Sequence, residues 1–115
     1  AYHTFKADTI VAEVNPGGDL VETMISTLDP TVPFKGVHAT RGKALRAEPV
    51  ASLYEQGRVL HHRFGDLSIL EEQMCSYIPN STKKSPDRLD ALVWAVTELL
   101  IKPSTLQPQE HLWQI

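Results

Sequence analysis

The sequence has little cysteine, few aromatic residues and no long apolar run. Its single cysteine, Cys75 among 115 residues, excludes an internal disulfide and a cysteine-based metal cluster. We expect Cys75 to be a small buried residue on a helix, in a chain from a reducing, intracellular setting. No apolar run reaches the ~18 residues of a membrane span, and the first residues lack the features of a secretory signal. They are typical instead of the end of a helix cut from something longer.

Other absences narrow the function. The net charge of −3 argues against an autonomous basic nucleic-acid binder. No serine, cysteine or histidine pattern suggests a nucleophilic active site. The turn NPGG at residues 15–18 matches neither a P-loop nor a dinucleotide fingerprint; Gly17 and Gly18 can cradle a phosphate, with an ordinary loop as the alternative. With 42% hydrophobic and 22% charged residues, the composition fits one globular domain, which we place at residues 1–102, before a Pro- and Gln-rich tail at 103–115.

Strand and helix patterns alternate along the chain. Short apolar runs predict strands at residues 9–14, 34–39 and 58–64, and helical spacing predicts helices at 19–28, 43–57, 66–78 and 85–100. Gly57 is the expected stop of the second helix, which Pro49 either begins or kinks. Strands separated by helices favour parallel pairing with right-handed crossovers. The sequence therefore predicts an α/β fold, whose first strand has an open edge unless more strands lie upstream.

Two adjacent histidines, His61 and His62, fall in the third predicted strand. Neighbouring strand residues point to opposite faces, so these two cannot chelate one metal together. We expect one of them in the core of the sheet and the other covered by a helix.

Residues 85–100, SPDRLDALVWAVTELL, are the most informative stretch. Ser85 is a good N-cap, and Pro86 suits the first helical position. Asp87 and Asp90 lie one turn apart near the positive end of the helix; a divalent metal can balance their repulsion, and the simpler alternative is a pair of acids that complement the helix dipole. A stripe of apolar residues at helical spacing is predicted to pack on the sheet, with Asp90 at its border: Leu89, Leu92, Val93, Val96, Leu99 and Leu100.

A third acid, Glu13, lies near the carboxyl end of the first predicted strand. Sites in α/β sheets form outside the carboxyl ends of the strands, so Glu13 is a candidate metal ligand. The alternative is that its side chain simply points into water at the end of the strand.

Basic residues form two small groups. The first contains Arg41, Lys43 and Arg46, with Lys35 nearby, and the second contains Lys83, Lys84 and Arg88. Lys43 and Arg46 share a helix face that can contact phosphates, unless it is an ordinary solvated surface. Cations beside a carboxylate pair suit a metal-dependent phosphodiesterase, because substrate and site are both anionic.

Four blocks occur in one order at close spacing: TIVAEVNPGGDLV, HATRGKALRAEPVASLYEQGRVLHH, LEEQMCSYIP and SPDRLDALVWAVTEL. Over residues 2–101 they resemble the C-terminal nuclease region of the large terminase subunit of tailed bacteriophages. The resemblance implies an RNase H-like fold and two-metal hydrolysis, with Mg²⁺ or Mn²⁺, of concatemeric viral DNA during packaging in the host bacterial cytoplasm. It implies double-stranded DNA, an upstream ATPase region and other packaging components as partners. By that resemblance Glu13 and Asp90 match metal-binding catalytic acids, and Asp87 matches an accessory position.

The chain also departs from the family pattern. The family's aspartate on the first strand of a β-hairpin sheet has no counterpart, since Asp8 lies at a helix–strand junction. We therefore expect a mostly parallel sheet flanked by helices that lacks the first strands of the full domain, binds Mg²⁺ or Mn²⁺ weakly and cleaves DNA poorly. Two other classes stay open: a non-catalytic prophage remnant or assembly fragment, and another RNase H-like nuclease or resolvase.

Overall fold

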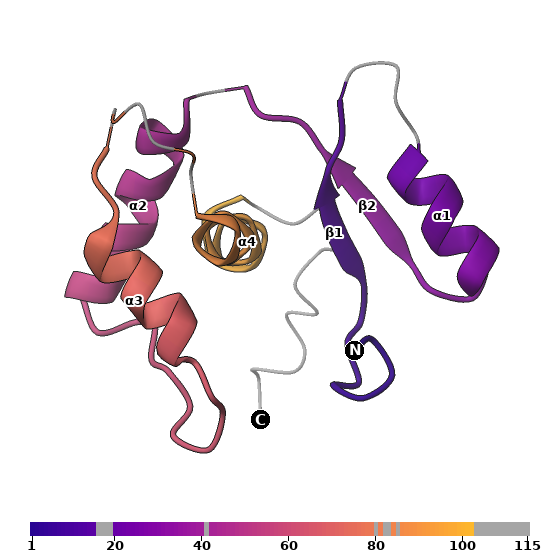
Figure 1. Ribbon diagram of the computed structural model, residues 1–115, viewed down its shortest axis with the longest axis horizontal. Coiled ribbons are helices and arrows are strands. Elements are labelled where there is room, and N and C mark those ends of the chain that lie inside the picture. Colours follow the sequence, from indigo (N-terminus) through magenta and orange to yellow (C-terminus); the bar gives the residue numbers. More distant parts are fainter. Residues whose placement is uncertain (16–19, 41, 80, 82–83, 85, 103–115) are drawn as a thin grey trace, which may run out of the picture. The chain divides into compact units, whose positions relative to one another are not determined.

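The computed structural model describes residues 1–15, 20–40, 42–79, 81, 84 and 86–102. The chain divides into two compact units, the strand unit (residues 1–40) and the helical unit (residues 41–115). The predicted tail at 103–115 lies outside the described residues. The elements are β1 (Ile10–Glu13), α1 (Leu20–Leu28), β2 (Phe34–Val37), α2 (Lys43–Glu55), α3 (Ser68–Ser76), α4 (Asp87–Val96) and a π-helix, η1 (Thr97–Ile101) (Figure 1).

The strand unit contains two parallel strands joined through α1. Ile10 pairs with Phe34 and Glu13 with Val37 in the parallel register of β1 and β2. This confirms the first two predicted strands and their parallel pairing, which requires a crossover connection such as α1. Gly36 fits close beside Val14, because a Cβ at this position would lie 3.1 Å from the Val14 Cγ2 atom.

Residues 2–7 have the hydrogen bonds of a helix C-terminus. The Ala7 N–H donates to the Tyr2 carbonyl (3.1 Å) and the Lys6 N–H to the His3 carbonyl (3.2 Å). Lys6 has a φ of 50°, the left-handed conformation that this Schellman arrangement requires at the residue after the C-cap. Residues 2–6 form turns, and the helix that the sequence suggested before them stays a prediction.

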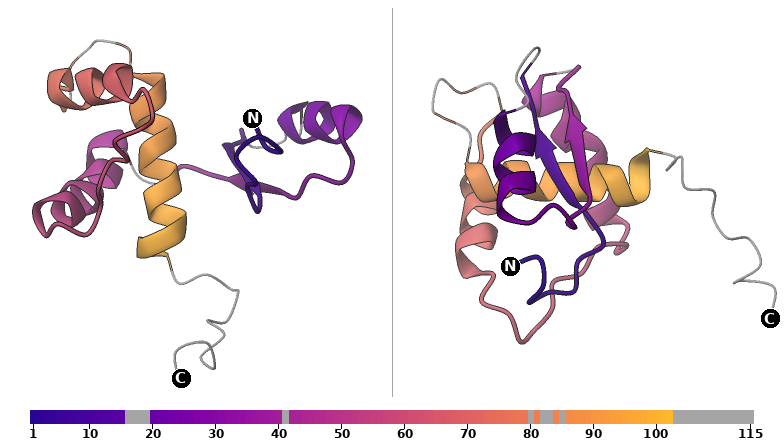
Figure 2. Two further views of the ribbon diagram at one scale, coloured as in Figure 1. Left: turned by 90° about the horizontal axis from the view of Figure 1, so that it is seen from below. Right: turned by 90° about the vertical axis from the view of Figure 1, so that its right-hand side faces the viewer.

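The helical unit packs α4 against α2 and α3 (Figures 1 and 2). Its buried core is contributed by α2 and α4 and consists of Val50, Leu53, Leu89, Val93 and Val96. Pro49 lies inside α2, which begins six residues earlier at Lys43. Gly57 ends the helix as predicted: its φ is 69°, its N–H donates to the Tyr54 carbonyl, and the Arg58 N–H donates to the Leu53 carbonyl.

The third predicted strand, residues 58–64, is wrong. The segment is a loop without strand pairing. Its side chains do alternate between the core and the solvent as in a strand: Val59 packs against the helical core, and Leu60 is 84% exposed. The inward side chains pack against helices rather than beside a neighbouring strand. The prediction that one histidine lies in the core of a sheet and the other under a helix is therefore wrong too: His61 is half-buried, and His62 is exposed.

Two further expectations about burial need correction. Cys75 is exposed, because Met74 turns toward the core and the next helical residue points about 100° away. The apolar stripe of α4 ends early: Leu99 is 79% exposed and Leu100 47%. The backbone widens there into η1, where the Lys102 N–H donates to the Thr97 carbonyl (2.8 Å), and wider turns shift the phase of the stripe. Packing of the stripe on the sheet stays a prediction.

Candidate active site

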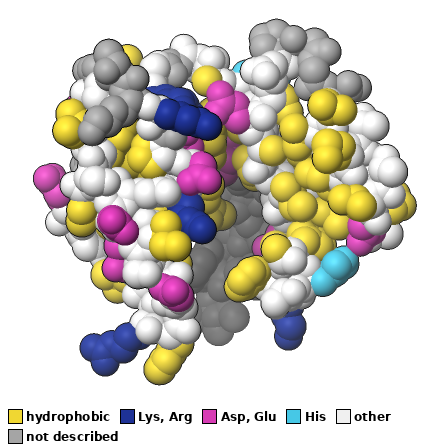
Figure 3. Space-filling model, viewed as in Figure 1, with side chains coloured by type: hydrophobic (Ala, Val, Ile, Leu, Met, Phe, Trp, Pro, Cys, Tyr) yellow, Lys and Arg dark blue, Asp and Glu magenta, His cyan; other side chains and the backbone are white. Residues whose placement is uncertain are grey.

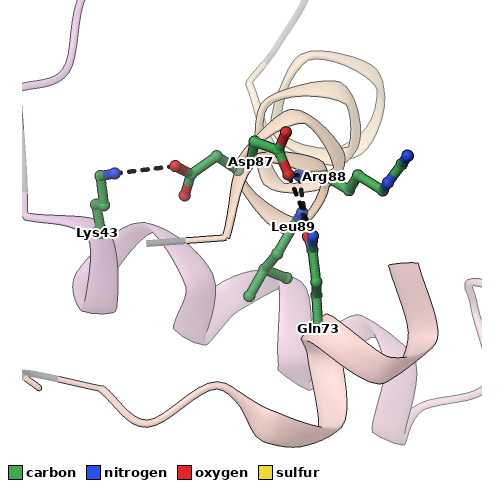
Figure 4. Close-up of polar contacts among 6 residues, drawn as sticks. Lys43, Gln73, Asp87, Arg88 and Leu89 are labelled. Carbon is green, nitrogen blue, oxygen red and sulfur yellow. Dashed lines mark hydrogen bonds and ion pairs between the residues drawn. The ribbon is translucent and has the colours of Figure 1, made fainter. Parts of the chain in front are cut away.

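The first turn of α4 is capped by a residue of another helix. Pro86 occupies the N-cap, not the predicted first helical position, and its side chain offers no acceptor. Gln73 of α3 supplies one instead: its Oε1 accepts hydrogen bonds from the N–H groups of Arg88 (3.0 Å) and Leu89 (3.1 Å) (Figure 4). These are N–H groups that a helix leaves without an internal partner. Ser85, the predicted cap, lies outside the described residues.

Asp87 is held by the same glutamine. Its Oδ1 accepts a hydrogen bond from Gln73 Nε2 (3.1 Å) and another from the Arg88 N–H (2.8 Å). The Gln73 bond first, and then the bond from the Arg88 backbone, lower the pKa of the Asp87 carboxyl below its usual value. Asp87 is therefore an oriented carboxylate, charged at neutral pH, at the positive end of α4.

Asp90 is paired with Lys43, the first residue of α2. Lys43 Nζ lies 2.9 Å from Asp90 Oδ2, with the side chains 49% and 28% exposed (Figure 4). Half-exposed ion pairs of this kind contribute about 0–1 kcal/mol, so another cation can compete for the carboxylate at little cost. A residue predicted to contact DNA thus lies against a residue predicted to bind metal.

The other basic residues that were predicted to contact DNA differ in their surroundings. The Arg46 guanidinium stacks over Trp94 of α4, 4.6 Å from the ring centroid, and Lys102 Nζ lies 5.5 Å from the same ring. Lys84 and Arg88 are exposed. Arg41 and Lys83 lie outside the described residues.

Glu13 is the last residue of β1, exposed, in the strand unit. The structure describes Glu13 within that unit, and its match to a metal-binding acid of the family stays a prediction, one that requires its carboxylate to lie close to that of Asp90. Among the residues that the structure describes, no three His, Cys, Asp or Glu side chains are grouped to hold a metal ion. The helical unit offers the carboxylates of Asp87 and Asp90, and one or two carboxylates completed by water or phosphate oxygens are a usual donor set for Mg²⁺.

The described elements are a small parallel two-stranded sheet and helices, consistent with part of an α/β fold. A family model described as "Terminase RNaseH-like domain" matches residues 1–99, and the chain belongs to this family. No curated protein and no solved structure matches the sequence significantly. In the described parts of the chain, each helix is too short or too polar to cross a lipid bilayer.

Proposed function

We propose that the chain is part of the nuclease of a bacteriophage terminase large subunit, which cuts concatemeric viral DNA during genome packaging in the host bacterial cytoplasm. Family membership over residues 1–99 supports the class of protein. The observation that carries the chemistry is the start of α4, where Gln73 orients Asp87 and a cation, Lys43, pairs with Asp90. An anionic substrate needs positive charge next to such carboxylates.

The proposed metal ligands are Asp90 and Asp87 from the helical unit and Glu13 from the strand unit, and the ion is Mg²⁺ or Mn²⁺. When bound, a pair of such ions supplies a hydroxide nucleophile and stabilises the leaving oxygen. The protein's own contribution is orientation. Gln73 fixes the Asp87 carboxylate by hydrogen bonding and keeps it ionised, and Lys43 balances the charge of Asp90 until a metal ion takes its place.

The proposed substrate is double-stranded DNA, bound through its phosphates. Lys43 can reach a phosphate once it leaves Asp90, and Arg46, Lys84 and Arg88 lie in the same unit; Arg41 completes the proposed set. Phosphate contacts position a duplex without reading its sequence, so cleavage is expected to be nonspecific. The upstream ATPase region and other packaging components are the proposed partners.

The test compares Asp90→Asn with Asp66→Asn. Asp66 also lies at the start of a helix in the same unit, where its Oδ1 accepts hydrogen bonds from Ser68, and asparagine can keep that role. Mn²⁺ broadens nearby amide resonances in NMR spectra, and plasmid nicking reports cleavage. We expect Mn²⁺ to broaden the resonances of residues 87–91 in the wild type and in Asp66→Asn, and to leave them sharp in Asp90→Asn. Slow Mn²⁺-dependent nicking should follow the same order.

Two results would contradict the proposal. If Mn²⁺ leaves residues 87–91 unaffected even at high millimolar concentration, the chain is a non-catalytic remnant or assembly piece. If nicking persists in Asp90→Asn, other residues carry the chemistry.

A further inference from the structure

The loop between α2 and α3, residues 58–66, is fixed at both ends (Figure 1). At its start, Gly57 and Arg58 close the C-terminus of α2 with hydrogen bonds to the carbonyls of Tyr54 (3.0 Å) and Leu53 (3.0 Å). At its end, Asp66 Oδ1 accepts hydrogen bonds from the N–H (3.2 Å) and hydroxyl (2.6 Å) of Ser68. The loop therefore starts and ends in defined geometry.

The middle of this loop is anchored by His61. Its Nδ1 lies 2.9 Å from Glu71 Oε1 on α3, and its Nε2 lies 2.8 Å from the Tyr54 hydroxyl on α2. A carboxylate only accepts, so Nδ1 carries a proton and donates it to Glu71, while Nε2 pairs with the Tyr54 hydroxyl. The Tyr54 ring also meets the imidazole edge-on at 5.5 Å. One half-buried side chain thus ties the loop to two helices.

The anchored loop turns a basic and aromatic surface outward. Phe64 is 89% exposed and Leu60 84%, and Arg58, His62 and Arg63 are exposed as well. Residues 58–66 contain two arginines and two histidines against one acid, Asp66, in a chain whose net charge is −3. The nearest acids along the chain are Asp66, which is hydrogen-bonded to Ser68, and Glu55, the last residue of α2. Local charge at the loop is therefore opposite in sign to that of the chain.

We propose that the loop of residues 58–66 is a preformed DNA contact, in which Arg58 and Arg63 bind backbone phosphates and Phe64 packs on a sugar or base. Guanidinium groups match phosphate geometry, and an aromatic face stacks on any base without reading sequence. A loop already held in place loses less conformational freedom on binding than a mobile one. The inference rests on the proposed function, since that function makes DNA the ligand.

The experiment measures binding of a fluorescently labelled duplex to the full chain by anisotropy, without divalent metal, over a salt series. Each lost phosphate contact should lower the slope of log K against log salt by about 0.9. The double variant Arg58→Ala, Arg63→Ala should therefore lose about two units of slope, and Arg58→Lys, Arg63→Lys should keep it. Phe64→Ala should weaken binding several-fold at unchanged slope. Phe5→Ala, which removes a phenylalanine 80% exposed in the strand unit, is the matched control and should have no effect.

Several outcomes are decisive. Unchanged slope and affinity in both loop variants, with unchanged circular dichroism, would overturn the loop proposal, and so would a wild type that binds no duplex at low salt. If loop variants bind normally while Asp90→Asn loses Mn²⁺ binding, the proposed function stands without the loop. If loop variants weaken metal-free binding while Mn²⁺ leaves residues 87–91 unaffected, the loop stands and the nuclease proposal fails.

Discussion

The two units of the chain differ in how they use apolar residues. In the helical unit, α2 and α4 bury five aliphatic side chains in one cluster, with partly buried residues of α3 around it. In the strand unit, Val37 alone among the described residues is buried, and α1 has no buried residue. The apolar side chains of α1 face outward, with Leu20 69%, Met24 57% and Leu28 85% exposed. Hydrophobic side chains gather accordingly over the strand unit in Figure 3.

This difference follows from the geometry of the elements. Three helices can turn their apolar stripes toward one axis and close a small core among themselves. Two parallel strands with one helix cannot, because a parallel sheet needs cover on both faces, and three or more strands are usual for independent stability. The described residues of the strand unit thus leave an apolar surface that they do not cover themselves, while the helical unit covers its own.

The largest expected effect comes from truncating the helical core. Leu53→Ala should lower the free energy of unfolding by about 2–5 kcal/mol, since it removes a buried side chain and leaves a cavity between α2 and α4. Leu28→Ala, the same change at an 85% exposed position of α1, should alter it by less than about 0.5 kcal/mol. Urea denaturation followed by circular dichroism measures both. If both substitutions lower the free energy of unfolding equally, the two units do not differ in how much their apolar side chains stabilise the fold.

The sequence predicted well what local periodicity governs. The strands at 9–14 and 34–39 and the helices at 43–57 and 85–100 were found within a few residues, and Gly57 ends its helix as expected. The strand prediction at 58–64 failed because successive side chains of an extended segment point to opposite sides whether or not another strand pairs with it. The packing of Val59 on the helical core and the contacts of His61 with Tyr54 and Glu71 show that this segment lies against helices.

The candidate site was only partly visible in the sequence. Helical spacing placed Asp87 and Asp90 together at one helix start. It could not reveal Gln73, which lies 14 residues before Asp87 on another helix and reaches it through tertiary packing. One indirect indication was available in the sequence. Pro86 can occupy the N-cap, but its side chain cannot accept hydrogen bonds from the first N–H groups of α4, so another residue or water has to accept them.

A middle-sized effect tests this tertiary cap. Gln73→Ala should destabilise the helical unit by about 0.5–2 kcal/mol, the usual cost of losing an N-cap, because the Leu89 N–H loses its acceptor and the Arg88 N–H keeps only Asp87. Gln56→Ala is the matched control, since Gln56 is exposed at the C-cap of α2 and its side chain donates to Ser52, four residues earlier. Amide hydrogen exchange at Arg88 and Leu89 should speed up in the first variant alone. Unchanged exchange there would mean that water replaces the cap without loss.

The smallest expected effect concerns the strand unit at acidic pH. Asp29, after α1, accepts hydrogen bonds from the Thr31 hydroxyl (2.6 Å) and N–H (3.0 Å), and lies 2.8 Å from His3 Nε2. The Thr31 hydroxyl first, and then His3, lower the pKa of Asp29 to about 2. A carboxyl whose pKa is lower in the folded chain stabilises it above the unfolded pKa of about 3.9 and loses that contribution as pH falls toward 2. Stability of the strand unit should therefore decline over this range in the wild type and decline less in Asp29→Asn.

The order of the two causes can be tested directly by carboxyl-carbon NMR titration of Asp29. Thr31→Ala should raise the pKa of Asp29 more than His3→Ala does, because the hydroxyl bond is local and short, whereas His3 is 74% exposed and its pairing is screened by solvent. Asp66 in the helical unit is the internal reference: hydrogen bonds from Ser68 lower its pKa too, and neither strand-unit substitution should move it. A larger shift of Asp29 in His3→Ala would make the contact with the N-terminal turn, rather than the turn at Thr31, the main constraint on this corner of the strand unit.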